Sequence, residues 1–354
     1  MKKITIYTLS AILVSASITY GQNSAYTNPS GYVSLGNTDE GQPAVAANTD
    51  LYATIPLLQA TQYTGKLELP SEANKLQFQT GAAFTAGQWT GSAHCVVITS
   101  GAKEGLTAII QSHTADELTL TLPNGSSLTG IVADDTAKII PCWTASTLFG
   151  DSVIPPGTNM FFYDVGPGET NSSAKVALVY GGAAAGWFYQ FDLINGTTGS
   201  ANDFIIHPSE GFVIRTGASP ITKLVVTGAV PVTKHSAILT KAVAGQAEDN
   251  IVGYTSPVGE KMSATGLGVT AGDSILIYDK KAQGQNKSAQ IGLVYGGEAA
   301  GWFYQFDLIN GNTGSANDYV LEPGTAFVYR RIANAPTGNV EWSSLPSYVP
   351  GLND

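Results

Sequence analysis

A block of 26 residues occurs twice in this sequence and constrains its fold more than any other feature. Residues 178–203 and 293–318 start 115 positions apart and are identical at 24 of 26 positions. The two differences are Ala183 against Glu298 and Thr197 against Asn312. A repeat at this spacing indicates a duplicated structural unit rather than a short solenoid repeat. We therefore expect two homologous units in which matching residues have matching environments.

The composition is typical of an all-β protein with many turns. The chain contains 40 glycines, and only 12% of its residues are charged. Glycine supplies turns, whereas the abundant Val, Thr and Tyr favour strands. The formal net charge of −10 argues against nucleic-acid partners and against anionic lipid, since both require basic surfaces.

The N-terminus has the pattern of an export signal. Lys2 and Lys3 precede an apolar stretch at residues 4–18, and Gly21 ends a small-residue cleavage site. We expect a signal peptide at residues 1–21 and no transmembrane segment in the mature chain, because no later apolar run reaches 18 residues. The exported protein would be extracellular or on the cell surface, with the periplasm as an alternative.

Hydrophobic alternation and turn signals divide the chain into segments. Several short alternating runs at 64–140 predict a small strand-rich domain, either a barrel or a compact sandwich. The full expected division is a first segment with early core strands at 22–63, the small domain at 64–140, β repeat 1 at 141–230, a connector at 231–249, β repeat 2 at 250–335 and a surface tail at 336–354.

Two cysteines remain in the expected mature chain, Cys95 and Cys142. An even pair in an oxidising compartment is compatible with a disulfide. Two unpaired buried thiols are the alternative, because a single pair 47 residues apart forms no recognisable framework. The sequence leaves both states open.

Several short motifs follow one another in a characteristic order. They are Ile-Pro-Leu-Leu at 55–58, Ser-Gly-Ala-Lys-Glu-Gly at 100–105, Leu-Thr-Leu at 118–120, Ile-Ile-Pro-Cys-Trp-Thr at 139–144, Tyr-Asp followed by Asn-x-Ser-Ala, and Pro-x-x-x-Phe-Val-x-Arg. Their order resembles that of a paralogous family of exported β-rich proteins from Verrucomicrobia and related bacteria, which has no known activity. Some members end in a C-terminal sorting segment, and we do not expect retention by that route because residues 350–354 do not match it.

The aromatic run Trp-Phe-Tyr-Gln-Phe-Asp at 187–192 allows two interpretations. Regular strand alternation would place Trp187, Tyr189 and Phe191 on one face. We favour a strand whose rings fill the core. The alternative is a sugar-stacking platform present twice, and its candidate ligand-binding residues are Trp187, Tyr189, Gln190, Trp302, Tyr304 and Gln305.

The turn after this run is rich in oxygen ligands and could hold Ca²⁺. It does not have the spacing of the 12-residue calcium loop and has no closing glutamate, and Asn-Gly and Thr-Gly form turns in any case. The candidate ligands are Asp192, Asn195 and Asp203, with Asp307, Asn310 and Asp318 in the second copy.

No catalytic motif with a known mechanism occurs in the sequence, so we do not expect an enzyme. We expect a secreted, non-catalytic structural or cell-surface protein that associates with itself, as a homo-oligomer or filament. The first alternative is a bivalent module that binds extracellular glycan or mediates adhesion. A secreted hydrolase is the second alternative.

Overall fold

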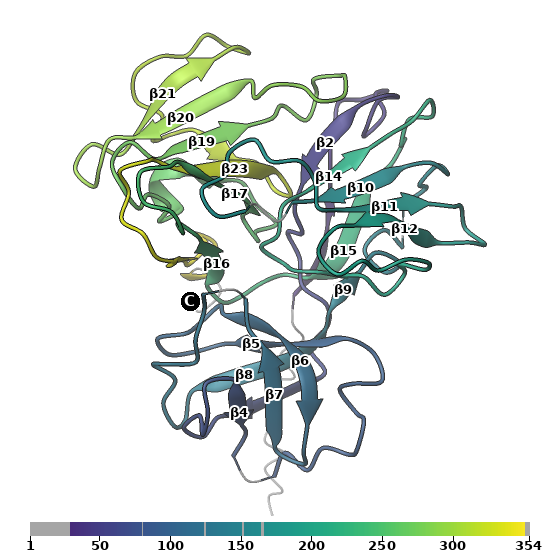
Figure 1. The fold of residues 1–354 in the computed structure, drawn as a ribbon, viewed down its shortest axis with the longest axis vertical. Coiled ribbons are helices and arrows are strands. Elements are labelled where there is room, and N and C mark those ends of the chain that lie inside the picture. The colour runs from purple at the N-terminus through teal and green to yellow at the C-terminus, as the bar shows by residue number, and fades with distance from the viewer. Residues whose placement is uncertain (1–28, 80, 124, 151, 164–165, 351–354) are drawn as a thin grey trace, which may run out of the picture.

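The regular secondary structure of this fold is almost entirely β-strand. The structure is a computed structural model that describes residues 29–79, 81–123, 125–150, 152–163 and 166–350 (Figure 1). The expected signal peptide lies outside these residues. Twenty-four strands and one short 3-10 helix, η1 (Met262–Ala264), make up the regular structure of this part of the chain, which confirms the all-β prediction. None of its helices is long and apolar enough to cross a membrane.

Two units of nine strands each form most of the molecule, and they match strand for strand. Each unit has one five-stranded sheet and two two-stranded ribbons. The sheets have the orders β12-β11-β10-β14-β2 and β21-β20-β19-β23-β17, and the ribbons are β1-β15 and β9-β13 in the first unit and β16-β24 and β18-β22 in the second. In Figure 1 the two sheets lie side by side, with β12 and β21 at their outer edges.

The first unit contains β1 (Ser30–Ser34), β2 (Asp50–Ala53), β9 (Trp143–Thr144), β10 (Asn159–Phe162), β11 (Val176–Tyr180), β12 (Trp187–Asp192), β13 (Ile205–Ile206), β14 (Phe212–Arg215) and β15 (Val225–Ala229). The second unit contains β16 (His235–Leu239), β17 (Glu248–Gly253), β18 (Glu260–Lys261), β19 (Ser274–Ile277), β20 (Ile291–Tyr295), β21 (Trp302–Asp307), β22 (Val320–Leu321), β23 (Ala326–Arg331) and β24 (Val340–Ser344).

A small β-barrel interrupts the first unit between β2 and β9. Its sheet has the order β3-β8-β5-β6-β7-β4, and a bridge between Leu67 and Phe78 joins the two edge strands. Its own hydrophobic core, which includes Phe78 and Trp89, fills the interior. The strands are β3 (Tyr63–Lys66), β4 (Lys75–Gln77), β5 (His94–Ile98), β6 (Thr107–His113), β7 (Glu117–Thr121) and β8 (Thr136–Pro141).

The unit boundaries differ from the expected ones in three places. β1 and β2 belong to the first unit, so the barrel is inserted into this unit and does not precede it. The expected connector at 231–249 contains β16, and the expected surface tail contains β24, which pairs with β16 and buries Trp342. These strands are short, and their partners lie about a hundred residues away, so local patterns do not reveal them.

Two chain segments connect the barrel to the first unit, one that enters the barrel and one that leaves it. Cys95 of β5 forms a disulfide with Cys142, which lies between β8 and β9, and this settles the question that the sequence left open. Next to it, the Trp143 indole donates a hydrogen bond to the Leu57 carbonyl at 2.9 Å. The segment that leads into the barrel and the segment that returns from it are therefore held together.

The two units contact each other through reciprocal pairs related by an approximate two-fold axis. Ala53 of β2 forms a bridge with Thr325, and the matching Val252 of β17 forms a bridge with Glu210. The Thr54 amide donates to the Gly324 carbonyl at 3.0 Å, and at the matching position the Gly253 amide donates to the carbonyl of residue 209 at 3.2 Å. A two-fold arrangement of this kind is the usual geometry of a homodimer, here realised within one chain.

Two matching clusters, which we call the clamps, link the units across this axis. In the first clamp, Arg215 donates to both carboxylate oxygens of Asp50 at 2.6 and 2.7 Å. Arg215 also donates to the side chain of Asn286 in the other unit at 2.7 Å, and the Asn286 amide donates to Asp50 at 2.7 Å. Each clamp thus joins a bidentate ion pair of one unit to an asparagine of the other.

The second clamp repeats this geometry with the units exchanged. Arg330 donates to Asp249 at 2.6 and 2.9 Å and to the side chain of Asn171 at 3.0 Å. The Asn171 amide donates to Asp249 at 2.8 Å. Asn171 and Asn286 both adopt positive φ, which asparagine tolerates better than most residues.

Candidate functional site

The tryptophans of the duplicated block lie in the cores of their units. Trp187 is 3% exposed and Trp302 is 1% exposed. Trp302 donates from its indole to the Leu267 carbonyl at 3.0 Å, and Trp187 packs against Tyr180 at a ring distance of 5.1 Å. The favoured core interpretation therefore describes these rings, and the proposed stacking platform is wrong for both tryptophans, because their faces are covered by protein.

A β-bulge changes the direction of the side chains in the second half of β12. Leu178 lies opposite Tyr189 and Ala177 lies opposite Phe191, so Gln190 has no partner in the pairing. Because this extra residue reverses the alternation, Phe191 does not share the face of Trp187 and Tyr189. The same bulge occurs in β21, where Gly292 lies opposite Phe306 and Gln305 is the extra residue. Tyr189 and Tyr304 are half-buried, and Gln190 and Gln305 are exposed.

The turn after β12 is organised by the carboxylate of Asp192. One carboxylate oxygen accepts from the amides of Ile194 and Asn195 at 3.0 and 2.9 Å, and the other accepts from the Thr197 amide at 3.4 Å. Desolvation opposes ionisation, but these donors hold the pKa of Asp192 below its ordinary value. Asp307 has the same arrangement with Ile309, Asn310 and Asn312. These carboxylates form the turns of their own chain segments.

The other candidate calcium ligands do not gather around these carboxylates. Asp318 accepts from Lys261 at 2.8 Å on an exposed surface, and Asp203 and Asn195 are exposed. Within the described ranges, no three His, Cys, Asp or Glu side chains lie close enough to form a metal site. Binding of Ca²⁺ stays a prediction, without support from this geometry.

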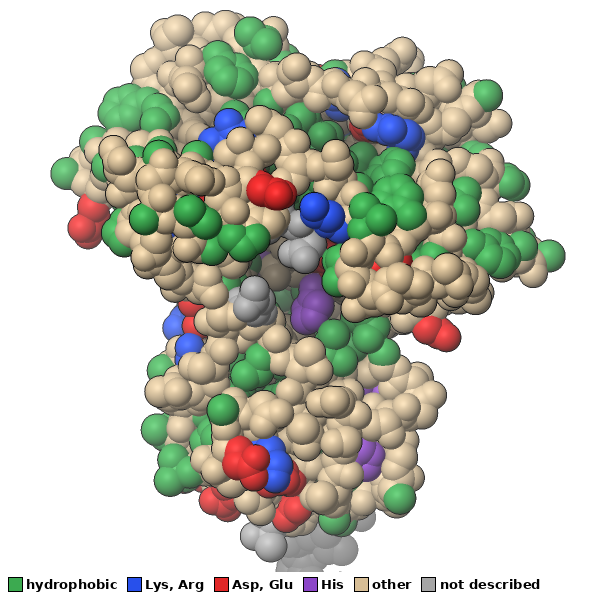
Figure 2. All heavy atoms as spheres, viewed as in Figure 1, with side chains coloured by type: hydrophobic (Ala, Val, Ile, Leu, Met, Phe, Trp, Pro, Cys, Tyr) green, Lys and Arg blue, Asp and Glu red, His purple; other side chains and the backbone are tan. Residues whose placement is uncertain are grey.

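Both turns present a pair of exposed apolar side chains at the outer edge of the molecule. Leu193 and Ile194 are 70% and 51% exposed, and Leu308 and Ile309 are 73% and 47% exposed. We call these two pairs the wing turns, because they follow β12 and β21, the outer strands of the two sheets. Figure 2 shows hydrophobic side chains at the outer ends of both upper lobes. Each pair forms a small apolar patch that another protein surface could cover.

Part of the identity between the two blocks has a clear structural cause. A Cβ atom at Gly186 would lie 2.2 Å from the Asn202 side-chain oxygen, which accepts from the Trp187 amide at 2.8 Å. The matching Gly301, Asn317 and Trp302 are arranged in the same way.

This structural cause does not extend to the wing turns, whose side chains project into solvent. By contrast, the central strands β10 and β19, which alternate between partly buried and buried positions, share no identical residue in four positions. Identity is thus retained at exposed positions where packing does not require it.

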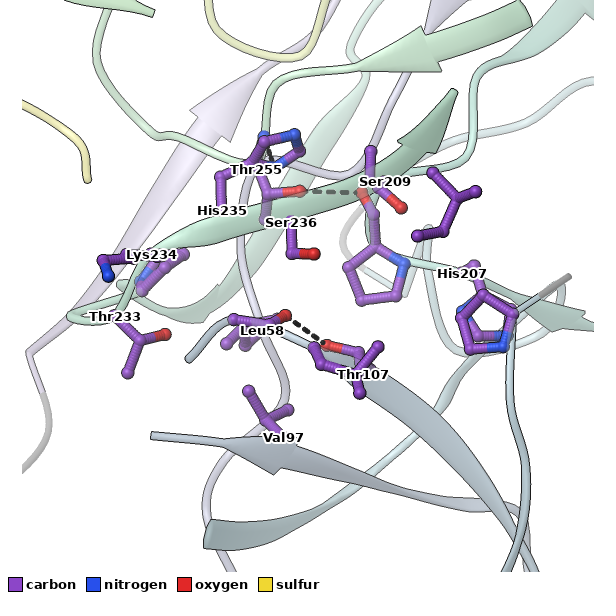
Figure 3. A pocket seen from close by; sticks show the side chains of 17 residues that line it. Leu58, Val97, Thr107, His207, Ser209, Thr233, Lys234, His235, Ser236 and Thr255 are labelled. Carbon is purple, nitrogen blue, oxygen red and sulfur yellow. Dashed lines mark hydrogen bonds between the residues drawn. The ribbon is translucent and has the colours of Figure 1, made fainter. Parts of the chain in front are cut away.

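A small cavity of about 40 Å³ lies where the barrel meets both units (Figure 3). His207 and His235 line it, and burial lowers the pKa of both, that of His235 to about 3. Thr255 donates from its hydroxyl to the Pro208 carbonyl at 2.9 Å across the same region. The space is enough for one or two water molecules, so a substrate does not fit beside these histidines.

Comparison with protein-family models, characterised protein sequences and solved structures gave no significant match to this chain. The functional argument therefore rests on the geometry of the chain itself.

Sequence reasoning missed the wing turns and the clamps. The wing turns could have been found from the identical Leu-Ile pairs in the two blocks. The clamps could not, because they join residues whose spacing along the chain has no local pattern.

Proposed function

We propose that this protein is a secreted, non-catalytic structural or cell-surface protein that associates with itself through its wing turns. The observation that carries the proposal is the same exposed Leu-Ile pair at the outer edge of each sheet. Burying one such side chain contributes about 1.5–3 kcal/mol, so a contact between two wing turns would gain appreciable free energy. Two equivalent sites on one rigid body allow linear assembly, because each subunit can contact two neighbours.

Two further observations agree with an extracellular setting. The Cys95–Cys142 disulfide is typical of oxidising compartments. The reciprocal clamps hold the two units in a defined orientation, which suits a repeating assembly more than a flexible tether. The resemblance to exported β-rich proteins supports the same location but adds no activity.

The test measures the mass and shape of the chain that begins at Gln22, by light scattering after gel filtration and by electron microscopy of the same samples. We expect concentration-dependent chains of the wild-type protein. The variant Leu193→Ser with Ile194→Ser should stop at dimers, since only the second wing remains. The matched variant Leu308→Ser with Ile309→Ser should do the same, and the fourfold variant should be a monomer.

Each outcome distinguishes the proposal from simpler explanations. Because all four side chains are exposed, the variants should unfold at the wild-type temperature, which separates lost assembly from lost folding. A wild-type monomer at every concentration would contradict self-association. Polymers that persist in the fourfold variant would place the contact elsewhere on the surface.

The glycan-binding alternative loses its original site, because Trp187 and Trp302 are buried. The hydrolase alternative gains no substrate-sized space beside His207 and His235, because the cavity there holds only one or two water molecules. For the duplicated blocks we therefore prefer self-association to glycan binding and to hydrolysis.

A further inference from the structure

A cavity of about 420 Å³ lies between the two five-stranded sheets, close to the axis that relates the units. Both units line it, since Tyr52 and Arg215 come from the first sheet, Asp249 comes from the second sheet, and Tyr278 directly follows β19 of the second unit. Cavities of this size fall within the range that holds small organic ligands. The wing turns and the cavity are formed by different residues, so this site is independent of the proposed self-association.

Aromatic rings form most of the apolar lining. Tyr52 and Tyr278 stack with their centroids 3.7 Å apart and their planes within 6°. The Arg215 guanidinium lies 4.9 Å from the centre of the Phe161 ring. Five aromatic rings line the cavity, and all of them are half-buried. They are Tyr52, Phe161, Tyr163, Phe191 and Tyr278. Phe191 reaches this face because of the bulge in β12.

The charged groups around the cavity are already paired. Arg215 and Arg330 are bound to Asp50 and Asp249 in the clamps. The Lys287 ammonium donates to the carbonyls of Asp279 and Ala282 at 2.8 and 2.6 Å. A strongly anionic ligand would have to compete with these partners, so the lining favours a neutral polar ligand.

Neutral donors and acceptors remain available beside the rings. In the clamps, Asn171 and Asn286 accept from arginine through their oxygens, and no hydrogen bond within the described part of the chain uses their side-chain NH₂ groups. The Tyr163 hydroxyl likewise has no hydrogen-bond partner among the described residues. Burial raises the pKa of Tyr163 to about 12, so at neutral pH this hydroxyl is protonated and both donates and accepts.

The two units differ at one matching pair of positions in the lining of this cavity. Tyr52 lies opposite Val213 in the first sheet, and Ile251 lies opposite Val328 in the second. Tyr52 stacks on Tyr278, whereas the matching Tyr163 has only the aliphatic Ile251 at the corresponding position. The missing ring leaves space beside Tyr163, and a flat ligand can fill that space.

We propose that this cavity binds a neutral carbohydrate, with a sugar ring stacked on Tyr163 in the position that Tyr52 occupies on the other side of the axis. Sugar rings combine apolar C–H faces, which pack on aromatic rings, with hydroxyl groups that need neutral donors and acceptors. The amide groups of Asn171 and Asn286 and the hydroxyl of Tyr163 supply these.

The test uses the chain that begins at Gln22 and measures binding of glucose, galactose, N-acetylglucosamine, cellobiose and maltose by calorimetry and by saturation-transfer NMR. We expect at least one sugar to bind with a dissociation constant in the micromolar to millimolar range. Ile251→Tyr should weaken binding by at least about tenfold, because the new ring would stack on Tyr163 and fill the site. Ile251→Val is the matched control and should bind like the wild type.

A second variant keeps the test decisive if Ile251→Tyr does not fold. Tyr163→Phe retains the ring and removes only the hydroxyl, so it should fold normally and weaken binding about fivefold. Absence of binding by all five sugars up to their solubility would overturn the proposal. Equal binding by the wild type and Ile251→Tyr, or tighter binding of glucose 6-phosphate than of glucose, would also overturn it.

Discussion

The first and second units have the same nine strands. They differ because only the first contains an inserted barrel, and because some side chains at the contact between the units differ. A barrel of six strands interrupts the first unit between β2 and β9, whereas the second runs without interruption. Both clamps are nevertheless present with matching distances. The fold therefore tolerates a large insertion at a turn, but the contact between the units depends on a few exact pairings.

The comparison also shows where the molecule departs from its own symmetry. Tyr52 and Ile251 occupy matching positions, and both line the cavity near the axis, so its aromatic lining is not symmetric. Ser30 and His235 begin the matching strands β1 and β16, so the first unit has a serine where the second has a buried histidine. Differences of this kind allow experiments that perturb one unit and use the other as control.

The largest effect is expected for the core tryptophans. Trp187→Ala and Trp302→Ala should each lower the free energy of unfolding by about 3–5 kcal/mol, because each deletes a buried ring and leaves a cavity. Denaturant unfolding measures this difference. Equal losses would show that the two cores are equivalent, whereas full stability in either variant would contradict the core role of that ring.

The clamps should give the next largest effect. Arg330→Met leaves Asp249 buried without its cation, and Arg215→Met does the same to Asp50, so each should cost about 3 kcal/mol. Adding Asp249→Asn to Arg330→Met should restore part of the loss. If the double variant is no more stable than the single one, the unpaired charge is not the cause.

Acid should destabilise the second unit through His235. Its pKa falls from 6.5 to about 3 in the folded protein because of burial, and its ring nitrogen accepts from the Thr255 amide at 3.3 Å. The unfolded chain therefore binds the proton more readily between pH 6.5 and pH 3, and stability is lost as the pH falls through this window. At pH 5 the expected loss is about 2 kcal/mol.

His235→Gln removes this titration and is the control for the acid effect. Its free energy of unfolding should depend less on pH between 6.5 and 5 than that of the wild type. An unchanged pH dependence would show that other groups cause the acid sensitivity. Hydrogen exchange at both pH values would report whether the second unit opens before the first.

The smallest effect is expected where the barrel touches the second unit. Lys103 and Glu341 form a partly buried ion pair at 2.8 Å, so Lys103→Ala should cost about 0.5–1 kcal/mol. Lys66 and Asp134 form an exposed pair at 2.9 Å within the barrel, and Lys66→Ala should have no measurable effect. Thermal unfolding of both variants compares them, and equal shifts would contradict a specific role for the contact between barrel and unit.

The sequence predicted the features that depend on local pattern or on self-comparison. It indicated an all-β chain and a small barrel or sandwich, because short alternating runs and turn residues determine strand formation, and the repeated block indicated two homologous units. It did not predict the bulges after Tyr189 and Tyr304, since strict alternation assumes one residue per pairing position. The bulge is the reason that Phe191 lines the cavity.

The sequence by itself determined that matching residues of the two blocks would have matching roles, which Trp187 and Trp302 illustrate. Only the tertiary structure decided that β2 belongs with β14, that Cys95 meets Cys142, and that each clamp takes its asparagine from the other unit. These pairings join residues 47 to 236 positions apart. Their partners are selected by the packing of whole sheets, and no spacing along the chain encodes that packing locally.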